Sequence, residues 1–234
     1  ILSRNMDIAQ MVDIICTGNP ARKTVNVKIR EGMEVEDIAE LLVEEGILDS
    51  TEEFLSLCRS GEAFSEYSFV NSILQSADKD QRKYALEGYL FPDTYEVYAD
   101  ASAKSVITKM LIRFNEIFSD EYMDRAQELN MTVDQAVTMA SMIEREAKTA
   151  DFDKVSAVFH NRLNSGMKLQ SDAPLKYILD AGNTLDYTSD QMAVNSPYNT
   201  YNIDGLPIGP ICNPSAAAIK AALYPDSDFM GEGY

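Results

Sequence analysis

The chain has 234 residues, 45% of them hydrophobic and 25% charged, a composition ordinary for a folded soluble protein with one large or two small domains. Its formal net charge of −18 argues against binding to nucleic acid or directly to anionic lipid, because phosphate-rich partners attract Lys and Arg. An acidic chain of this kind tolerates a neutral or amide-rich ligand such as a glycan.

The first 85 residues predict a small mixed α/β unit. Residues 24–30 alternate Val and Ile with polar side chains, which is typical of a half-buried strand. Residues 35–45 carry apolar side chains at helical spacing, and Ser50 with Glu53 has the spacing of a capping box at the start of a second helix. The flanking predictions are a helix over residues 8–15 and a mixture of helix and loops over 61–83.

Residues 86–98, LEGYLFPDTYEVY, place aromatic side chains around the turn signal Pro92-Asp93. We predict a strand-turn-strand unit packed into the core, because aromatic side chains are usually buried, and a sugar-stacking surface is the alternative. Pro92 also indicates a nearby domain boundary. We therefore predict an N-terminal module with a connecting helix over 1–85 and a second domain over 86–234.

The second domain is predicted to be mainly helical, which makes the fold class α+β. Amphipathic periodicity predicts helices over residues 103–118, 120–129, 132–148, 153–163, 172–179 and 214–223. The stretch 195–213 is rich in Pro, Gly, Asn and Tyr, and it predicts an ordered loop.

The helix predicted over 132–148 is the central element of this domain. Thr132 and Gln135 have capping-box spacing, which marks its start. At about 100° per residue, its Val, Ala, Met and Ile side chains fall on one apolar face.

Glu144 falls inside this apolar face, whereas Glu146 lies at its margin. Because burial disfavours a charged carboxylate, a carboxyl group at this position suits a general acid working near neutrality. A structural ion pair of Glu144 with Lys148 or Arg162 is the alternative explanation.

Cysteine and histidine usage excludes several kinds of site. Cys16, Cys58 and Cys212 are odd in number and widely spaced, so they suggest neither a zinc site nor a disulfide scaffold. A single histidine, His160, removes most Ser-His-Asp, Cys-His and histidine-metal schemes, and we expect it to be structural. We expect no metal and no cofactor.

Two further segments combine polar side chains with a constrained backbone. Gln170, Ser171 and Asp172 precede a predicted helix start, where helix capping is the simple explanation. The other segment lies in the predicted loop, where amides, hydroxyls and aromatic faces suit sugar hydroxyls and N-acetyl groups. It consists of Tyr198, Asn199, Thr200 and Tyr201.

Four segments in this order resemble the YceG-like (MltG) family of membrane-anchored endolytic murein transglycosylases. They read LEGYLFPDTY, MASMIEREAK, VFHNRLNSGMKLQSDAP and NSPYNTYNIDGLPIGPICNPSAAAIKAAL. The resemblance covers nearly the whole chain, and it implies a LysM-like N-terminal module. It places the family's catalytic glutamate within Ala140–Glu146, and we assign the role to Glu144 on the apolar face, with Glu146 as the alternative. The glycan site that it implies is lined by Gln170, Ser171, Asp172, Tyr198, Asn199, Thr200 and Tyr201.

The chain also departs from the family pattern. SDAPLKY replaces the family's usual SDPTVxY and shifts Pro174 by one position. The family's transmembrane helix is expected upstream of the given sequence, since no apolar run here approaches the ~20 residues of a membrane span. A final strand pair is expected downstream of it. The resemblance implies a single-pass protein of the cell membrane with an extracytoplasmic catalytic domain.

The implied substrate is the glycan strand of peptidoglycan, and the implied protein partners are penicillin-binding synthases and other elongation proteins. The implied reaction cleaves the β-1,4 bond between N-acetylmuramic acid and N-acetylglucosamine without water and leaves a 1,6-anhydro end. Ordinary glycosidases use two carboxylates, whereas here Glu144 is expected to act first as acid and then as base. Three alternatives remain: a peptidoglycan-binding module without turnover, a scaffold for cell-wall synthases, and a hydrolase with Glu146 or Asp172 as base.

Overall fold

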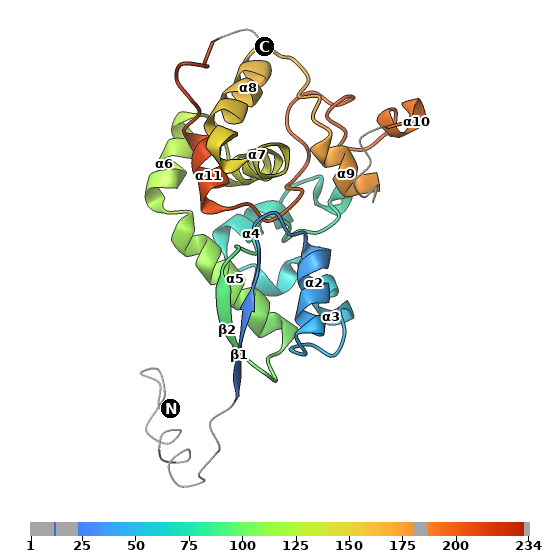
Figure 1. Cartoon of the computed structure of the whole chain (residues 1–234), viewed down its shortest axis with the longest axis vertical. Helices are drawn as coiled ribbons and strands as arrows, with labels where there is room; N and C mark the ends of the chain where they lie inside the picture. The colour runs from blue at the N-terminus through green and yellow to red at the C-terminus, as the bar shows by residue number, and fades with distance from the viewer. Residues whose placement is uncertain (1–11, 13–22, 180–186, 232–234) are drawn as a thin grey trace.

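The structure is a computed structural model that describes residues 12, 23–179 and 187–231 (Figure 1). The predicted helix over 8–15 lies outside these residues, apart from Val12. Helices and one small antiparallel sheet make up the fold, which confirms the α+β class. The elements are β1 (Thr24–Lys28), α2 (Val35–Glu44), α3 (Glu52–Ser60), α4 (Ser68–Leu74), β2 (Thr94–Tyr98), α5 (Ala103–Ile117), α6 (Asp120–Glu128), α7 (Val133–Glu146), α8 (Phe152–Asn164), α9 (Ala173–Leu179), α10 (Ser189–Met192) and α11 (Ala216–Leu223).

The sheet is a two-stranded ribbon in which β1 pairs antiparallel with β2. Thr24 lies opposite Tyr98, and Lys28 lies opposite Thr94. Val27 points into the core while its neighbours are exposed, which is the alternation that the sequence predicted for this strand.

Only the second half of the aromatic segment 86–98 is a strand, so the strand-turn-strand prediction is wrong for residues 86–93. Gly88 has φ of +89°, and a Cβ there would lie 2.5 Å from Pro210 and 2.9 Å from Val137. Only glycine suits this position, because the backbone is left-handed and Pro210 and Val137 leave no room for a Cβ. Leu90 donates its N–H to the Asn213 side chain at 2.8 Å. This hydrogen bond goes to a loop, whereas the prediction placed a neighbouring strand there.

The helices of the N-terminal unit begin with different caps. At α2, the Asp37 carboxylate accepts the N–H of Glu34 at 2.9 Å, which is one half of a capping box. The predicted capping box of Ser50 and Glu53 does not form, because the N-cap residue of α3 is Thr51 in a helical conformation without a side-chain cap.

In the helical part of the molecule, α7 is the central element, seen nearly end-on in Figure 1 and packed against α4, α6, α8, α9 and α11. Residues 136–143 are all buried, which explains the long apolar face in the sequence. The predicted capping box is confirmed: Thr132 Oγ1 accepts the Gln135 N–H at 3.1 Å, and Gln135 Oε1 accepts the Thr132 N–H at 2.9 Å.

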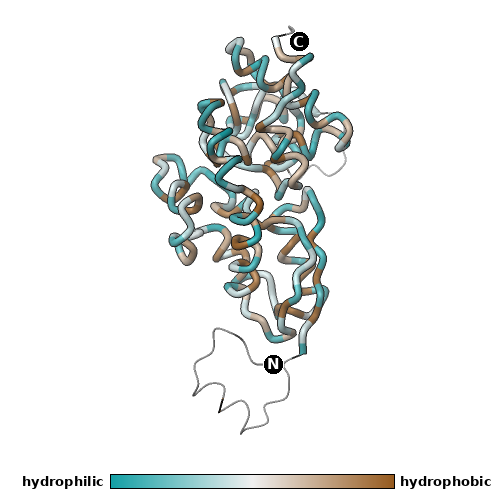
Figure 2. Tube along the Cα trace, turned by 90° about the vertical axis from the view of Figure 1, so that its left-hand side faces the viewer, coloured by the Kyte–Doolittle hydropathy of each residue, from teal (hydrophilic) through white to brown (hydrophobic). Residues whose placement is uncertain are grey.

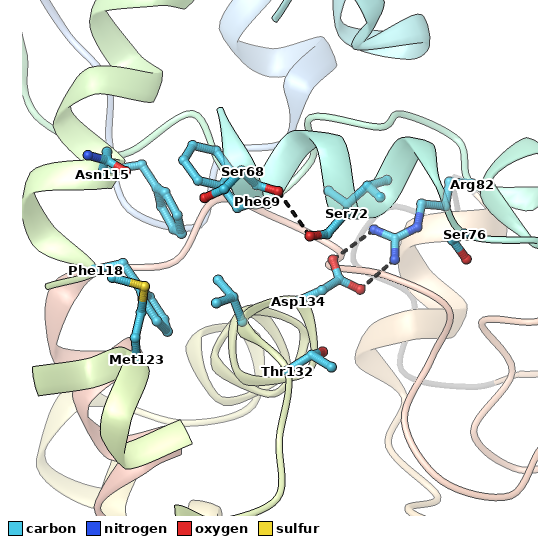
Figure 3. A pocket seen from close by; sticks show the side chains of 13 residues that line it. Ser68, Phe69, Ser72, Ser76, Arg82, Asn115, Phe118, Met123, Thr132 and Asp134 are labelled. Atoms are coloured by element: carbon cyan, nitrogen blue, oxygen red, sulfur yellow. Dashed lines mark hydrogen bonds and ion pairs between the residues drawn. The ribbon is translucent and has the colours of Figure 1, made fainter. Parts of the chain in front are cut away.

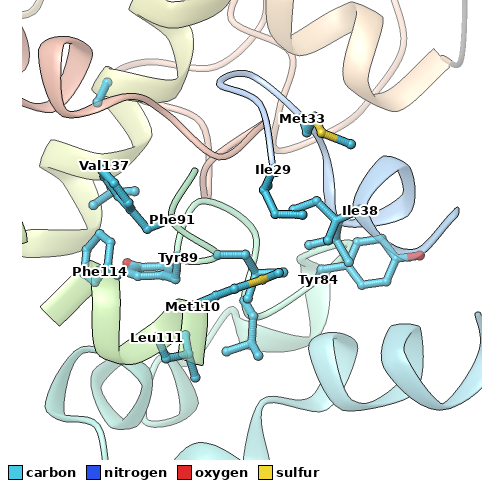
Figure 4. Packing of buried hydrophobic residues seen from close by; sticks show 14 of the residues in the cluster. Ile29, Met33, Ile38, Tyr84, Tyr89, Phe91, Met110, Leu111, Phe114 and Val137 are labelled. Carbon is cyan, nitrogen blue, oxygen red and sulfur yellow. The ribbon is translucent and has the colours of Figure 1, made fainter. Parts of the chain in front are cut away.

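One hydrophobic core runs through both parts of the chain. In Figure 4, Ile29 and Ile38 of the N-terminal unit belong to the same cluster as Tyr89, Phe114 and Val137. Along the tube in Figure 2, hydrophobic and hydrophilic residues alternate within single helices, as amphipathic packing requires. The division at residue 85 stays a prediction, although both the sheet and the core cross it.

Candidate active site

The last turn of α7 carries three consecutive charged side chains that reach three different segments. The Glu144 carboxylate bonds to Ser215, and Arg145 bonds to the turn after β1. The Glu146 carboxylate bonds to Ser171. The final turn is therefore the point where three distant parts of the sequence meet.

Glu144 is half-buried, and its carboxylate is engaged by the N-cap residue of α11. Ser215 donates both its N–H, at 2.9 Å, and its hydroxyl to the same oxygen of Glu144. Within the described residues, Ser215 takes the place of Lys148 and Arg162, which the sequence offered as ion-pair partners. The Glu144 carboxylate thus contacts the start of α11.

Glu146 is exposed and lies beside the two loops that the sequence predicted to line the site. Ser171 donates its hydroxyl to Glu146 Oε2 at 3.0 Å, and the same hydroxyl accepts the N–H of Ala173 at 3.3 Å. Because Ser171 is only 3% exposed, its hydroxyl is fixed in direction. The chain thus holds an accessible carboxylate by one buried hydroxyl.

The two predicted loops are joined by hydrogen bonds. Thr200 Oγ1 accepts the Ser171 N–H at 3.0 Å and donates to the Ser171 carbonyl at 2.8 Å. The Gln170 N–H donates to the Thr200 carbonyl at 3.2 Å. Segments 169–172 and 198–201 therefore form one surface next to Glu146.

A second carboxylate and a phenol lie on this surface. Tyr201 donates its hydroxyl to Asp172 Oδ1 at 2.7 Å. Burial is the main cause that raises the pKa of Tyr201 to about 12, and the charges of Asp172 and Glu146 act in the same direction. Among the predicted site residues on this surface, Gln170 is exposed, and Asp172 and Tyr201 are half-buried.

The remaining predicted residues are buried and hold the loop. Tyr198 is 3% exposed and packs its ring against Tyr177, with centroids 5.2 Å apart. Asn199 is fully buried, and its amide group donates to the carbonyls of Met192 and Val194 at 2.9 and 2.8 Å. Direct contact of Tyr198, Asn199 or buried Thr200 with substrate stays a prediction.

The sequence reasoning missed a cluster of buried polar groups where α2, α9 and the loop before α11 meet. Glu87 is 1% exposed, and its carboxyl group accepts bonds from the Val35 N–H, the Tyr177 hydroxyl and the Asn213 amide. The available signal was a charged residue inside the apolar run LEGYLF, since buried carboxyls require partners.

His160 is buried, and its Nε2 lies 2.9 Å from the Ala222 carbonyl, as expected of a structural histidine. Cys58 and Cys212 are free and buried, and Cys16 lies outside the described residues. In the part of the chain that the structure describes, no group of three or more potential metal ligands is assembled.

A cavity of about 370 Å³ lies at the opposite end of α7, between α4, α5 and α6 (Figure 3). Phe69 and Phe118 contribute apolar walls, and the ion pair of Arg82 with Asp134 closes one side. None of the predicted site residues lines this cavity. The 14 residues of α7 correspond to roughly 20 Å, so the cavity and Glu146 are at separate ends of the molecule's central helix.

Comparisons with known proteins identify the family of the chain. The model of the YceG-like family matches residues 1–230. An endolytic murein transglycosylase of Bacillus subtilis is 30% identical over 235 residues, which is 98% of this chain and 64% of that protein. An endolytic murein transglycosylase of Streptococcus pneumoniae is 35% identical over 167 residues, which is 69% of this chain and 30% of that protein.

A crystal structure of a yceG-like protein from Listeria monocytogenes superposes with a TM-score of 0.75 at 31% identity, covering 97% of this chain and 75% of that one. The chain thus spans less than two thirds of the length of the two transglycosylases to which it is similar. Because the family model covers nearly the whole sequence, the chain belongs to the YceG-like family.

Proposed function

We propose that the chain is a lytic transglycosylase that cuts the glycan strands of peptidoglycan, with Glu146 as the general acid. The observation that carries this proposal is the accessible Glu146 carboxylate, held by Ser171 beside Asp172 and Tyr201. Its support outside the structure is the name endolytic murein transglycosylase, which the relatives from Bacillus subtilis and Streptococcus pneumoniae carry.

Glu146 replaces Glu144 in this assignment because of the partners that each carboxylate has. A general acid has to reach the glycosidic oxygen of the substrate. Glu144 accepts two bonds from Ser215 and is turned toward the start of α11, whereas Glu146 is exposed next to both predicted loops. The apolar periodicity that favoured Glu144 is equally compatible with a half-buried carboxylate that holds the start of α11.

In the proposed reaction, protonated Glu146 donates its proton to the oxygen that leaves C1 of N-acetylmuramic acid. The C1–O4 bond breaks, and the 6-hydroxyl of the same sugar attacks C1. Glu146 then accepts the proton of that hydroxyl, so the carboxyl group is regenerated and no water is consumed. The substrate's own acetamido group stabilises the cationic centre, and Gln170 and Tyr201 contact the sugars.

Asp172 supports a second candidate, a hydrolase in which this carboxylate activates water. Tyr201 fixes the Asp172 carboxylate on the same surface as Glu146, and a carboxylate pair of this kind is what inverting and retaining glycosidases use. The two candidates differ in their products: hydrolysis leaves a reducing end, and transglycosylation leaves a 1,6-anhydro end.

The first experiment is mass spectrometry of purified glycan strands after incubation with the wild type, Glu146→Gln and Glu144→Gln. We expect internal cuts with 1,6-anhydro ends from the wild type, and a loss of about 10²- to 10⁴-fold in rate for Glu146→Gln. Glu144→Gln is the matched control, because the glutamine oxygen can still accept both bonds from Ser215. It should retain activity within about 10-fold of the wild type.

Other outcomes have defined meanings, provided that circular dichroism shows each variant to be folded. An active Glu146→Gln with an inactive Glu144→Gln would return the acid role to Glu144. Reducing ends would establish the hydrolase. Intact strands from the wild type, together with co-sedimentation with insoluble peptidoglycan, would indicate a binding module.

The proposed substrate also indicates where the protein acts. Peptidoglycan lies outside the cytoplasmic membrane, so we propose an extracytoplasmic catalytic domain. Among the described residues, no helix combines the length and apolar character needed to cross a bilayer. Single-pass anchoring and partnership with penicillin-binding synthases or other elongation proteins stay predictions.

A further inference from the structure

The end of α7 has no glycine cap to fix its direction. The helix ends at Glu146, and the next residue, Ala147, has an extended conformation with φ of −131°. The last four carbonyls of a helix lack partners within the helix, so a terminal turn frays unless other groups hold it. The direction in which Glu146 points therefore depends on the side chains that anchor this turn.

Arg145 provides such an anchor from the N-terminal unit. One of its guanidinium nitrogens donates to the Gly32 carbonyl at 3.0 Å, across 113 residues of sequence. Another lies 3.4 Å from Glu34 Oε1. Both acceptors belong to the turn between β1 and α2, and the planar guanidinium group bridges them.

The turn that receives Arg145 is itself held in place. Gly32 has φ of +77°, a left-handed conformation that favours glycine. Its N–H donates to the Asn213 carbonyl at 2.9 Å, and the Asn213 N–H donates to the Met33 carbonyl at 2.9 Å. The buried Asn213 side chain adds a bond to Glu87 at 3.1 Å. The Gly32 carbonyl is thus a fixed acceptor.

From this geometry we propose that Arg145 is a positioning residue, which ties the last turn of α7 to the Gly32–Glu34 turn and so sets the direction of Glu146. The inference rests on the proposed function for the role of Glu146. It makes the N-terminal unit part of the active-site framework, because that unit supplies both acceptors of Arg145.

The ion pair between Arg145 and Glu34 has a pH dependence, whereas the bond to the Gly32 carbonyl has none. Burial is the largest cause that raises the pKa of Glu34 to about 7, and Arg145 opposes it. Glu34 therefore gains its charge, and Arg145 its ion pair, as the pH rises through neutrality. The charged groups that face Glu34 are Arg145, Lys83, Asp37, Glu36 and Glu87.

The test compares Arg145→Gln, Arg145→Lys and Arg113→Gln in steady-state cleavage of glycan strands. Arg145→Gln should lower kcat by about 10- to 100-fold with KM little changed, because the acid is misdirected while the sugar contacts remain. Arg145→Lys should recover only part of this loss, since one ammonium cannot span both acceptors. Arg113, paired with Asp93 and Glu116 on α5, is the matched control and should behave as wild type.

Hydrogen–deuterium exchange gives a readout independent of turnover. Backbone amides of residues 143–147 should exchange at least about 10-fold faster in Arg145→Gln, while amides of α5 remain protected. Uniformly faster exchange would mean global destabilisation and would overturn the proposal. A Glu34→Gln variant should keep, at every pH, the kcat/KM that the wild type shows below pH 7, and it should lack the rise in kcat/KM that the wild type shows as Glu34 ionises near pH 7.

Failure of the inference and failure of the proposed function are distinguishable. Wild-type kcat and unchanged exchange in Arg145→Gln, with Glu146→Gln inactive, would overturn the positioning role alone. If the wild type showed no turnover, the proposed function would fail, and the exchange of residues 143–147 would decide the anchoring by itself. A step in kcat/KM near pH 7 that persists in Glu34→Gln would show that the charge of Glu34 does not contribute to the positioning of Glu146.

Discussion

At the scale of single residues, Glu87 shows how a buried carboxyl group can link separate segments of the chain by hydrogen bonds. It lies where α2, α9 and the loop before α11 meet, and it accepts bonds from Val35, Tyr177 and Asn213 at 3.2, 3.3 and 3.1 Å. Burial is the largest cause that raises its pKa to about 8. At neutral pH Glu87 is therefore mostly uncharged, and it joins the N-terminal unit to the helical part without a full buried charge.

This raised pKa predicts the pH dependence of stability. Between the ordinary value of 4.5 and about 8, the folded protein binds the Glu87 proton more tightly than the unfolded chain does. The contribution of Glu87 is therefore fully present below pH 4.5 and is lost as the pH rises through 8. The free energy of unfolding should fall across this window by at most about 1.4 kcal/mol per pH unit relative to Glu87→Gln.

Urea denaturation of the wild type and Glu87→Gln at intervals between pH 5 and pH 8.5 measures this difference. The method readily resolves a change of about 1.4 kcal/mol per pH unit in the free energy of unfolding. Glu53→Gln, at an exposed position on α3, is the control and should follow the wild type at every pH. Parallel curves for the wild type and Glu87→Gln would show that Glu87 has the same proton affinity in both states.

The choice between Glu144 and Glu146 illustrates what sequence reasoning can reach at this scale. The family segments pointed to the loops around Ser171 and Tyr201, and hydrogen bonds join these two loops in the structure. Periodicity cannot rank two carboxylates in one helical turn, however, because their partners come from elsewhere. Ser215 lies 71 residues after Glu144, and Ser171 lies 25 residues after Glu146.

At the scale of elements, α7 is predicted well because its stability is encoded locally. Its apolar period and its capping box lie within the sequence 132–148, and the structure places the helix at Val133–Glu146. The same holds for α5 and α8. The conformation of residues 86–93 was not predicted, because it depends on the close contact of Gly88 with Pro210. Pro210 lies 122 positions later, and a local sequence pattern does not reveal this contact.

The cap of α7 can be tested by Thr132→Ala. Thr132 is exposed, so the substitution removes the hydroxyl that satisfies the Gln135 N–H and leaves the core intact. We expect a loss of about 1 kcal/mol in the free energy of unfolding, measured by urea denaturation. Thr108→Ala, in the middle of α5, is the matched control and should change stability by less than about 0.5 kcal/mol. Equal effects of the two substitutions would contradict a capping role.

At the scale of the whole molecule, the N-terminal unit and the helical part are joined by pairing, bonding and packing. β1 pairs with β2 along five residues, and the Ile29 N–H donates to the Asp93 carbonyl at 2.9 Å. Val35 bonds to Glu87, and Gly32 bonds to Asn213. The sequence suggested a boundary at residue 85 because Pro92 and the aromatic run stand out locally, whereas contacts between distant segments leave no such local mark.

These contacts predict that residues 86–234 do not fold alone. Without β1 the strand β2 has no partner, Tyr95 and Val97 lose their cover, and Glu87 and Asn213 lose their bonds to the N-terminal unit. A single strand is not stable in water, and unpaired buried polar groups add to the loss. In thermal circular dichroism, the fragment should show no cooperative transition, and the full chain should show one. Adding a separate fragment of residues 1–85 should restore the transition, because this fragment supplies the missing contacts from a second molecule. A cooperative transition and dispersed NMR amide signals from 86–234 alone would instead make residue 85 a true folding boundary, with the N-terminal unit docked on a finished domain.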